Sequence, residues 1–119
     1  MSIVSYEEMS RAVDRNAHLA SPADFMVLRF ILGRTYGCGK EWAKIRPTHF
    51  IDGIYEDDGA IITPPLTMSA RTLHTRIAVL ESHGMLLVDR SSKTFSYCLN
   101  PRWFLSCENK DSQTIGPPL

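Results

Sequence analysis

No stretch of the 119-residue sequence approaches the roughly 20 consecutive apolar residues that a membrane-spanning helix requires. The first ten residues, MSIVSYEEMS, also lack the basic region and the long apolar run of a secretory signal. The three cysteines, Cys38, Cys98 and Cys107, are an odd number without close spacing, which is not the pattern of a disulfide framework. We therefore expect a cytoplasmic protein with reduced thiols.

A basic excess is missing as well, because 13 lysine and arginine residues balance 13 acidic residues. Dedicated nucleic-acid binders usually carry such an excess, so this balance disfavours that class. The charges are segregated, however. Residues 34–49 hold four cationic side chains and one acidic one, residues 50–65 hold four acidic ones, and residues 66–99 hold four cationic and two acidic ones. A basic face can therefore exist on a neutral molecule, with weak non-specific affinity for DNA and a shallow salt dependence.

Length and composition indicate one globular domain. The chain is long enough to build a core without metal ions or disulfides, and its 44% apolar and 22% charged content is ordinary. We divide it into a domain over residues 1–105 and a disordered polar tail over residues 106–119. Within the domain, residues 1–19 form a helix and connector, and residues 20–105 form the core.

The clearest element is a helix that begins after Ser69. Its hydroxyl can accept a hydrogen bond from the first helical turn, which makes Ser69 a good N-cap. Leu73, Ile77 and Leu80 recur at the helical period and define one apolar face. The helix ends before Gly84, which can adopt the left-handed conformation of a C-terminal cap.

Two short strands follow this helix. Residues 85–88 are an apolar run and residues 94–99 are rich in strand-forming residues, with a polar turn at residues 89–93 between them. The order helix, strand, basic turn, strand is typical of the second half of a winged helix-turn-helix, in which a helix enters a DNA groove and a hairpin flanks it. The predicted fold is therefore mainly α with a small β component, a winged helix with a C-terminal β-hairpin wing.

The first two helices carry recognisable N-terminal signals. Ser5 and Glu8 match a capping box, in which each side chain bonds the other residue's backbone N–H. Ser21 and Pro22 begin a second, widely apolar helix that we expect to end near residues 36–37 and to form the centre of the core. An apolar stripe of Tyr6, Met9 and Val13 on the first helix predicts packing against the domain.

The middle of the chain predicts a strand at residues 42–45, a short helix at residues 47–53 and an acidic hairpin. The hairpin signal is Asp58-Gly59 between residues 54–55 and 60–62. We interpret the short helix as the first helix of the helix-turn-helix, separated from the second by this hairpin. The acidic tip at residues 56–58 is interpreted as solvated rather than metal-bound.

These segments resemble a known family. Residues 30–37 (FILGRTYG), 49–55 (HFIDGIY) with Asp58-Gly59, 66–73 (LTMSARTL) and 80–86 (LESHGML) resemble the winged-helix domain of phage replication proteins of the replisome-organiser, O-type class and related phage helix-turn-helix proteins. The similarity covers residues 20–103 and implies duplex DNA binding in a bacterial host cell. Such proteins generally continue into a region that recruits a helicase or loader, which has no counterpart in these residues.

The candidate DNA-binding residues follow from this interpretation. We expect the helix to present its polar side chains to bases or nearby phosphates, the turn to contact the DNA backbone, and the N-cap residue to offer a backbone N–H to a phosphate. The preceding loop and strand supply two further backbone contacts. The helix residues are Arg71, Thr72, Thr75 and Arg76, and the turn residues are Arg90 and Lys93. The N-cap residue is Ser69, and the loop and strand residues are Lys40 and Lys44.

A protein-directed role is the alternative to DNA binding. A winged helix from a mobile element can act on proteins, as an adaptor or as an anti-CRISPR-type inhibitor of a host defence complex, through its scaffold or an acidic surface. DNA binding is favoured if one exposed basic face is formed by Arg71, Arg76, Arg90 and Lys93, and the protein-directed role is favoured if it is not. A homodimer is also considered, with the stripe on the first helix as its candidate interface.

Enzymatic activity is not expected. The four histidines, His18, His49, His74 and His83, lack metal-ligand spacing, and no cysteine–histidine pair matches a nucleophile pattern. Residues 33–39 contain one residue too many for a phosphate-binding P-loop, and Glu41 stands where that motif needs serine or threonine. We therefore predict no catalytic residue, metal, cofactor or small-molecule substrate.

Overall fold

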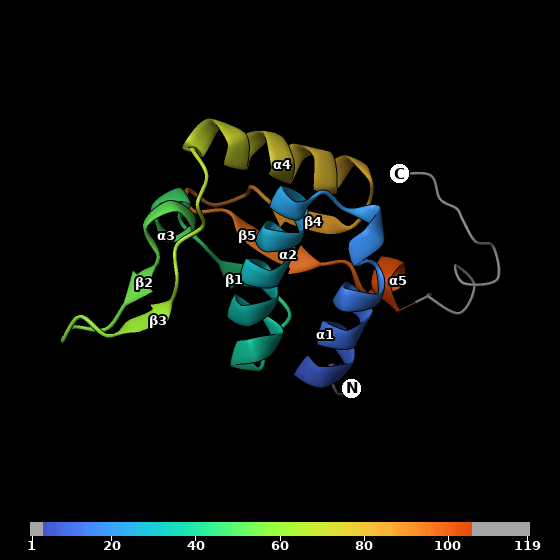
Figure 1. Cartoon of the computed structure of the whole chain (residues 1–119), viewed down its shortest axis with the longest axis horizontal. Coiled ribbons are helices and arrows are strands. Elements are labelled where there is room, and N and C mark those ends of the chain that lie inside the picture. The colour runs from blue at the N-terminus through green and yellow to red at the C-terminus, as the bar shows by residue number, and fades with distance from the viewer. Residues whose placement is uncertain (1–3, 106–119) are drawn as a thin grey trace.

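The computed structural model describes residues 4–105, so the tail at residues 106–119 lies outside the described residues. The described residues form a small α+β domain. Five α-helices and two 3-10 helices alternate with five short strands (Figure 1). The elements are α1 (Tyr6–Arg15), η1 (Ala17–Leu19), α2 (Pro22–Arg34), η2 (Tyr36–Cys38), β1 (Ala43–Lys44), α3 (Pro47–Asp52), β2 (Ile54–Tyr55), β3 (Ile61–Thr63), α4 (Ala70–Ser82), β4 (Leu86–Asp89), β5 (Ser96–Leu99) and α5 (Pro101–Phe104).

Three serine side chains cap the three longest helices, as their positions predict. Ser5, Ser21 and Ser69 each accept a hydrogen bond from the backbone N–H three residues later, at 3.1–3.2 Å. The reciprocal half of the predicted capping box is wrong, because the Glu8 carboxylate accepts from the Ser5 hydroxyl instead of from a backbone N–H. Helix α2 also ends earlier than predicted. The Thr35 hydroxyl bonds the Ile31 carbonyl and the chain continues as η2.

The strands form two separate antiparallel sheets. One has the order β1-β5-β4, in which β5 pairs with β4 on one side and with β1 on the other. The other is the predicted hairpin of β2 and β3, which projects from the body of the molecule (Figure 1). At the base of this hairpin, Gly53 has a φ of +87°, and a Cβ there would lie 2.9 Å from the Thr63 carbonyl oxygen. Only glycine fits both restrictions.

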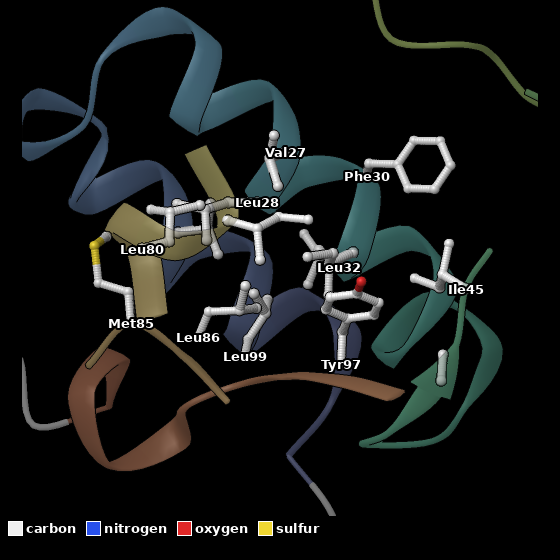
Figure 2. Close-up of a cluster of buried hydrophobic side chains, with 14 of the residues drawn as sticks. Val27, Leu28, Phe30, Leu32, Ile45, Leu80, Met85, Leu86, Tyr97 and Leu99 are labelled. Carbon is white, nitrogen blue, oxygen red and sulfur yellow. The ribbon is translucent and has the colours of Figure 1, made fainter. Parts of the chain in front are cut away.

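The core lies between the three-stranded sheet and the helices. Side chains from α2, α4 and the sheet converge on one apolar cluster (Figure 2). Its labelled members are Val27, Leu28, Phe30, Leu32, Ile45, Leu80, Met85, Leu86, Tyr97 and Leu99. The Phe50 ring of α3 packs against Phe30 at 4.8 Å and edge-on against Tyr97 at 5.5 Å between centroids, which attaches α3 to both α2 and β5.

Helix α1 contributes most of its apolar stripe to this core. Met9 and Val13 are almost completely buried, whereas Tyr6 remains exposed. Packing of the stripe against the domain is therefore confirmed. Two of the three side chains of the stripe are therefore not accessible to a partner. Phe104 of α5 is also buried, so the segment after the last strand returns to the body as expected.

Candidate nucleic-acid interface

Helix α4 turns its apolar face inward. Leu73, Ile77 and Leu80 are buried against α2 and the sheet, as their spacing predicts. Arg71 and Thr75, four residues apart, lie on the opposite face and are exposed. Within residues 4–105, no carboxylate pairs with Arg71. Arg71 is therefore a cationic group in the first turn of the helix that is available to a ligand.

The hydroxyl groups on this helix are partly used by local hydrogen bonds. The Thr75 hydroxyl donates to the Arg71 carbonyl oxygen at 3.1 Å. The Ser69 hydroxyl accepts from the backbone N–H of Thr72 and donates to the Thr72 hydroxyl at 3.1 Å. Ser69 therefore serves as the predicted cap, and Thr72 retains its own hydroxyl proton for an external acceptor.

Arg76 lies on the flank of α4 that faces the first turn of α2. One guanidinium nitrogen is 3.3 Å and 3.4 Å from the two carboxylate oxygens of Asp24. The Asp24 side chain is only 9% exposed and that of Arg76 27%. The charge of Arg76 is therefore used in an internal ion pair, and the expectation of one exposed basic face fails at this residue.

Arg90 is also paired, in this case with Glu81 at the C-terminal end of α4. Two guanidinium nitrogens donate to the two carboxylate oxygens at 2.8 and 2.7 Å, and the guanidinium lies 5.5 Å from the Phe95 ring centroid. These hydrogen bonds lower the pKa of Glu81 below its usual value and raise the pKa of Arg90. Both side chains remain partly exposed, so a phosphate can compete with Glu81 for Arg90.

A cleft of about 280 Å³ separates α4 from the β4–β5 turn. Its floor is apolar, and its polar lining comes from both elements: His74 on the helix, and Arg90, Lys93 and Thr94 on the turn. Arg71 lies about one helical turn before His74 on α4 but does not line the cleft. No acidic residue lines the cleft.

The turn itself is held by its first residue. The Asp89 carboxylate accepts from the Ser91 backbone N–H at 2.9 Å. Hydrogen bonds from Ser91, with a smaller contribution from the nearby charge of Lys44, lower the pKa of Asp89. Lys93 is exposed at the turn, and no ion pair involves it in the part of the chain that the structure describes.

Two predicted contacts lie away from this cleft. Lys44 pairs with Ser96 on β5, which in turn pairs with Asp89, and this row is on the face of the sheet opposite the buried row of Ala43 and Tyr97. Lys40 follows η2, beyond the end of α2 that is farther from the Asp24–Arg76 pair. That separation is one helix length, roughly 18 Å at 1.5 Å per residue. The cleft therefore brings His74, Arg90 and Lys93 together, whereas Arg71, Lys40 and Lys44 do not line it.

Sequence reasoning missed two residues of the cleft, His74 and Thr94. The sequence gives His74 no ligand or nucleophile pattern, although its position three residues after Arg71 places both on neighbouring turns of one helix. Thr94 was assigned to a strand, whereas the structure places it in the turn before β5.

No group of three or more histidine, cysteine, aspartate or glutamate side chains within residues 4–105 is arranged to hold a metal ion. None of the helices described is both long and apolar enough to cross a bilayer. Comparison of the chain with protein-family models, with curated proteins and with solved structures found no match. The similarity to phage replication proteins therefore stays a prediction.

Proposed function

We propose that this chain is a winged-helix protein that binds duplex DNA through α4 and the β4–β5 turn. Element order supports the fold assignment: α2, β1, α3, α4, β4 and β5 follow one another with a single inserted hairpin. The sheet order β1-β5-β4 places the last two strands as a ribbon beside α4. The similarity of residues 20–103 to phage replication domains, and hence a role in replication initiation or transcription control, belongs to the same proposal.

The observation that carries this proposal is the cleft between α4 and the β4–β5 turn. Cationic or titratable side chains from both elements line it, namely His74, Arg90 and Lys93, and the exposed Arg71 lies on the same helix as His74. A helix in the major groove with a flanking turn on the backbone needs this arrangement of cations. In this proposal Arg71 and Thr72 approach base edges, and Lys93 contacts a phosphate.

The ion pairs of Arg76 and Arg90 limit the expected affinity for DNA. Arg76 and Arg90 contribute less than free cations because each already has a carboxylate partner. Few phosphates are therefore neutralised, and log affinity is expected to fall slowly with log salt concentration. Specific binding then depends on the contacts of Arg71 and its neighbours with bases.

One observation favours a second function, directed at a protein. Two of the four side chains expected to form the basic face are in ion pairs, and the acidic hairpin projects from the body (Figure 1). An adaptor or an inhibitor of a host complex, of the anti-CRISPR type, can use such an acidic projection. Absence of duplex binding at low salt would favour this function over DNA binding.

The test is fluorescence anisotropy of a labelled random-sequence duplex at low and at physiological salt. We expect micromolar binding that weakens with salt, and a several-fold loss in Arg71→Ala and Lys93→Ala. Arg11→Ala is the matched control, because it removes an exposed cation from α1 without touching α4. Equal losses in Arg71→Ala and Arg11→Ala would show that net charge, and not α4, governs binding.

A further inference from the structure

The β2–β3 hairpin exposes apolar side chains, and within residues 4–105 no second layer of structure covers them. Tyr55 and Ile61 are paired across the two strands, so they lie on the same face, and they are 48% and 60% exposed. An isolated two-stranded ribbon is marginally stable in water. Exposed apolar residues on a ribbon that projects from the domain indicate a surface that is covered in a complex.

A groove of about 640 Å³ lies beside the same hairpin, along α2. Phe25, Met26 and Phe30 supply apolar lining from the helix, and Ile62 and Pro65 supply it from the opposite wall. The groove is open at Gly33, where a Cβ would have no atom within 4 Å. The helix therefore presents apolar side chains to an open groove next to the hairpin.

The charges of the hairpin and of the groove are opposite. The hairpin tip carries Glu56, Asp57 and Asp58, all exposed. Arg29 and Arg34 line the groove. Arg29 is paired with Asp14, whereas Arg34 bonds only the Thr63 hydroxyl, at 3.5 Å, and has no carboxylate partner within residues 4–105. An apolar ribbon with an acidic tip is the complement of an apolar groove that contains a guanidinium without a carboxylate partner among the described residues.

We propose that two copies of this chain associate by reciprocal exchange, with the β2–β3 hairpin of each copy docked in the groove along α2 of the other. A second copy is the occupant that the charges favour, because the chain is neutral overall and carries both complementary surfaces. Hairpin and groove are adjacent, since Ile62 and Thr63 of β3 form one wall of the groove. In a two-fold arrangement of this kind every contact is made twice.

The apolar contact is tested by sedimentation velocity of the full chain without DNA, from low micromolar to submillimolar concentration. We expect a monomer–dimer equilibrium that weakens by about tenfold or more in Ile61→Ser. Gly33→Leu is expected to fill the groove and give a monomer without loss of melting temperature, because leucine has a higher helix propensity than glycine. Leu87→Ser, on the exposed side of β4, is the matched control and should dimerise normally.

The charge contact is tested by complementary swaps. Glu56→Lys/Asp57→Lys and Arg34→Glu are each expected to be monomeric, since each creates like charges at both contacts. Asp58 is retained because its carboxylate accepts from the Ala60 backbone N–H and holds the turn. An equimolar mixture of the two variants restores opposite charges at both contacts and is expected to form a heterodimer.

Two outcomes would overturn the exchange: a wild-type chain that stays monomeric at the highest concentration, or swapped variants that fail to pair when mixed. The inference does not rest on duplex binding. No residue altered in these variants belongs to the interface at α4, so the two proposals can fail separately.

Discussion

The carboxylate of Glu81 and the guanidinium of Arg90 form a two-pronged ion pair, with N–O distances of 2.7 and 2.8 Å, between the end of α4 and the β4–β5 turn. The pair connects the two elements that border the cleft. It also neutralises one of the cations expected to contact DNA. The same ion pair thus fixes the position of the turn and offsets the positive charge of Arg90.

Glu81→Gln is expected to strengthen duplex binding by a few-fold. The amide keeps a hydrogen-bond acceptor for Arg90 but removes the competing negative charge, so that Arg90 becomes available to a phosphate. Anisotropy titrations at low salt measure the effect. Glu7→Gln in the first turn of α1 makes the same change in net charge at a remote, exposed position. An equal effect in both variants would exclude a specific role for the ion pair.

Arg76→Ala is expected to destabilise the fold by about 1–3 kcal/mol, because it leaves the buried Asp24 carboxylate without its partner. Arg71→Ala, on the exposed face of the same helix, should leave stability within about 0.5 kcal/mol of wild type. Urea denaturation measures both. Asp24→Asn combined with Arg76→Ala should recover part of the loss, and no recovery would indicate that Arg76 stabilises α4 by another contact.

Tyr36→Phe is expected to leave stability unchanged or to raise it by about 1 kcal/mol. The Tyr36 side chain is buried, and its hydroxyl is the one buried side-chain polar atom of residues 4–105 without a hydrogen-bond partner. Removing the hydroxyl eliminates a desolvation penalty that no hydrogen bond offsets, while the ring keeps its packing. Thermal unfolding at neutral pH provides the measurement. A clear drop in melting temperature would mean that the hydroxyl has a partner in solution.

Stability is expected to fall at alkaline pH. Burial raises the pKa of Tyr36 from 10.0 to about 12 and the pKa of Cys98 from 9.0 to about 11. Because the folded state holds these protons more tightly than the unfolded state, their contribution is fully present below about pH 9 and is lost as the pH rises through 11 to 12.

The measurement of this effect is the urea midpoint at pH 8 and at intervals up to pH 11. The decline should be shallower in Tyr36→Phe, which removes one of the two titrating groups. An identical slope in wild type and variant would assign the alkaline loss to other residues, such as Tyr97, whose pKa burial also raises.

Several residues of the candidate site could be predicted from the sequence because they belong to one contiguous segment. The segment from Ser69 to Lys93 contains the cap, the exposed Arg71 and the polar turn. Lys40 and Lys44 were assigned by charge alone and lie elsewhere. Charge in a sequence says nothing about the face on which a side chain lies, and Lys44 belongs to the outer row of a sheet whose partner strand is about fifty residues away.

The sequence by itself determined most of the local structure. Serine caps, the Asp58-Gly59 turn and the glycine after α4 act through contacts within four or five residues, so they can be recognised from the sequence without knowledge of the fold. The tertiary structure alone decided which charges are free. Asp24 and Arg76 are 52 residues apart and meet only because α2 packs against α4. Ion pairs depend on the relative placement of whole elements, and that placement is set by burial of the shared apolar core.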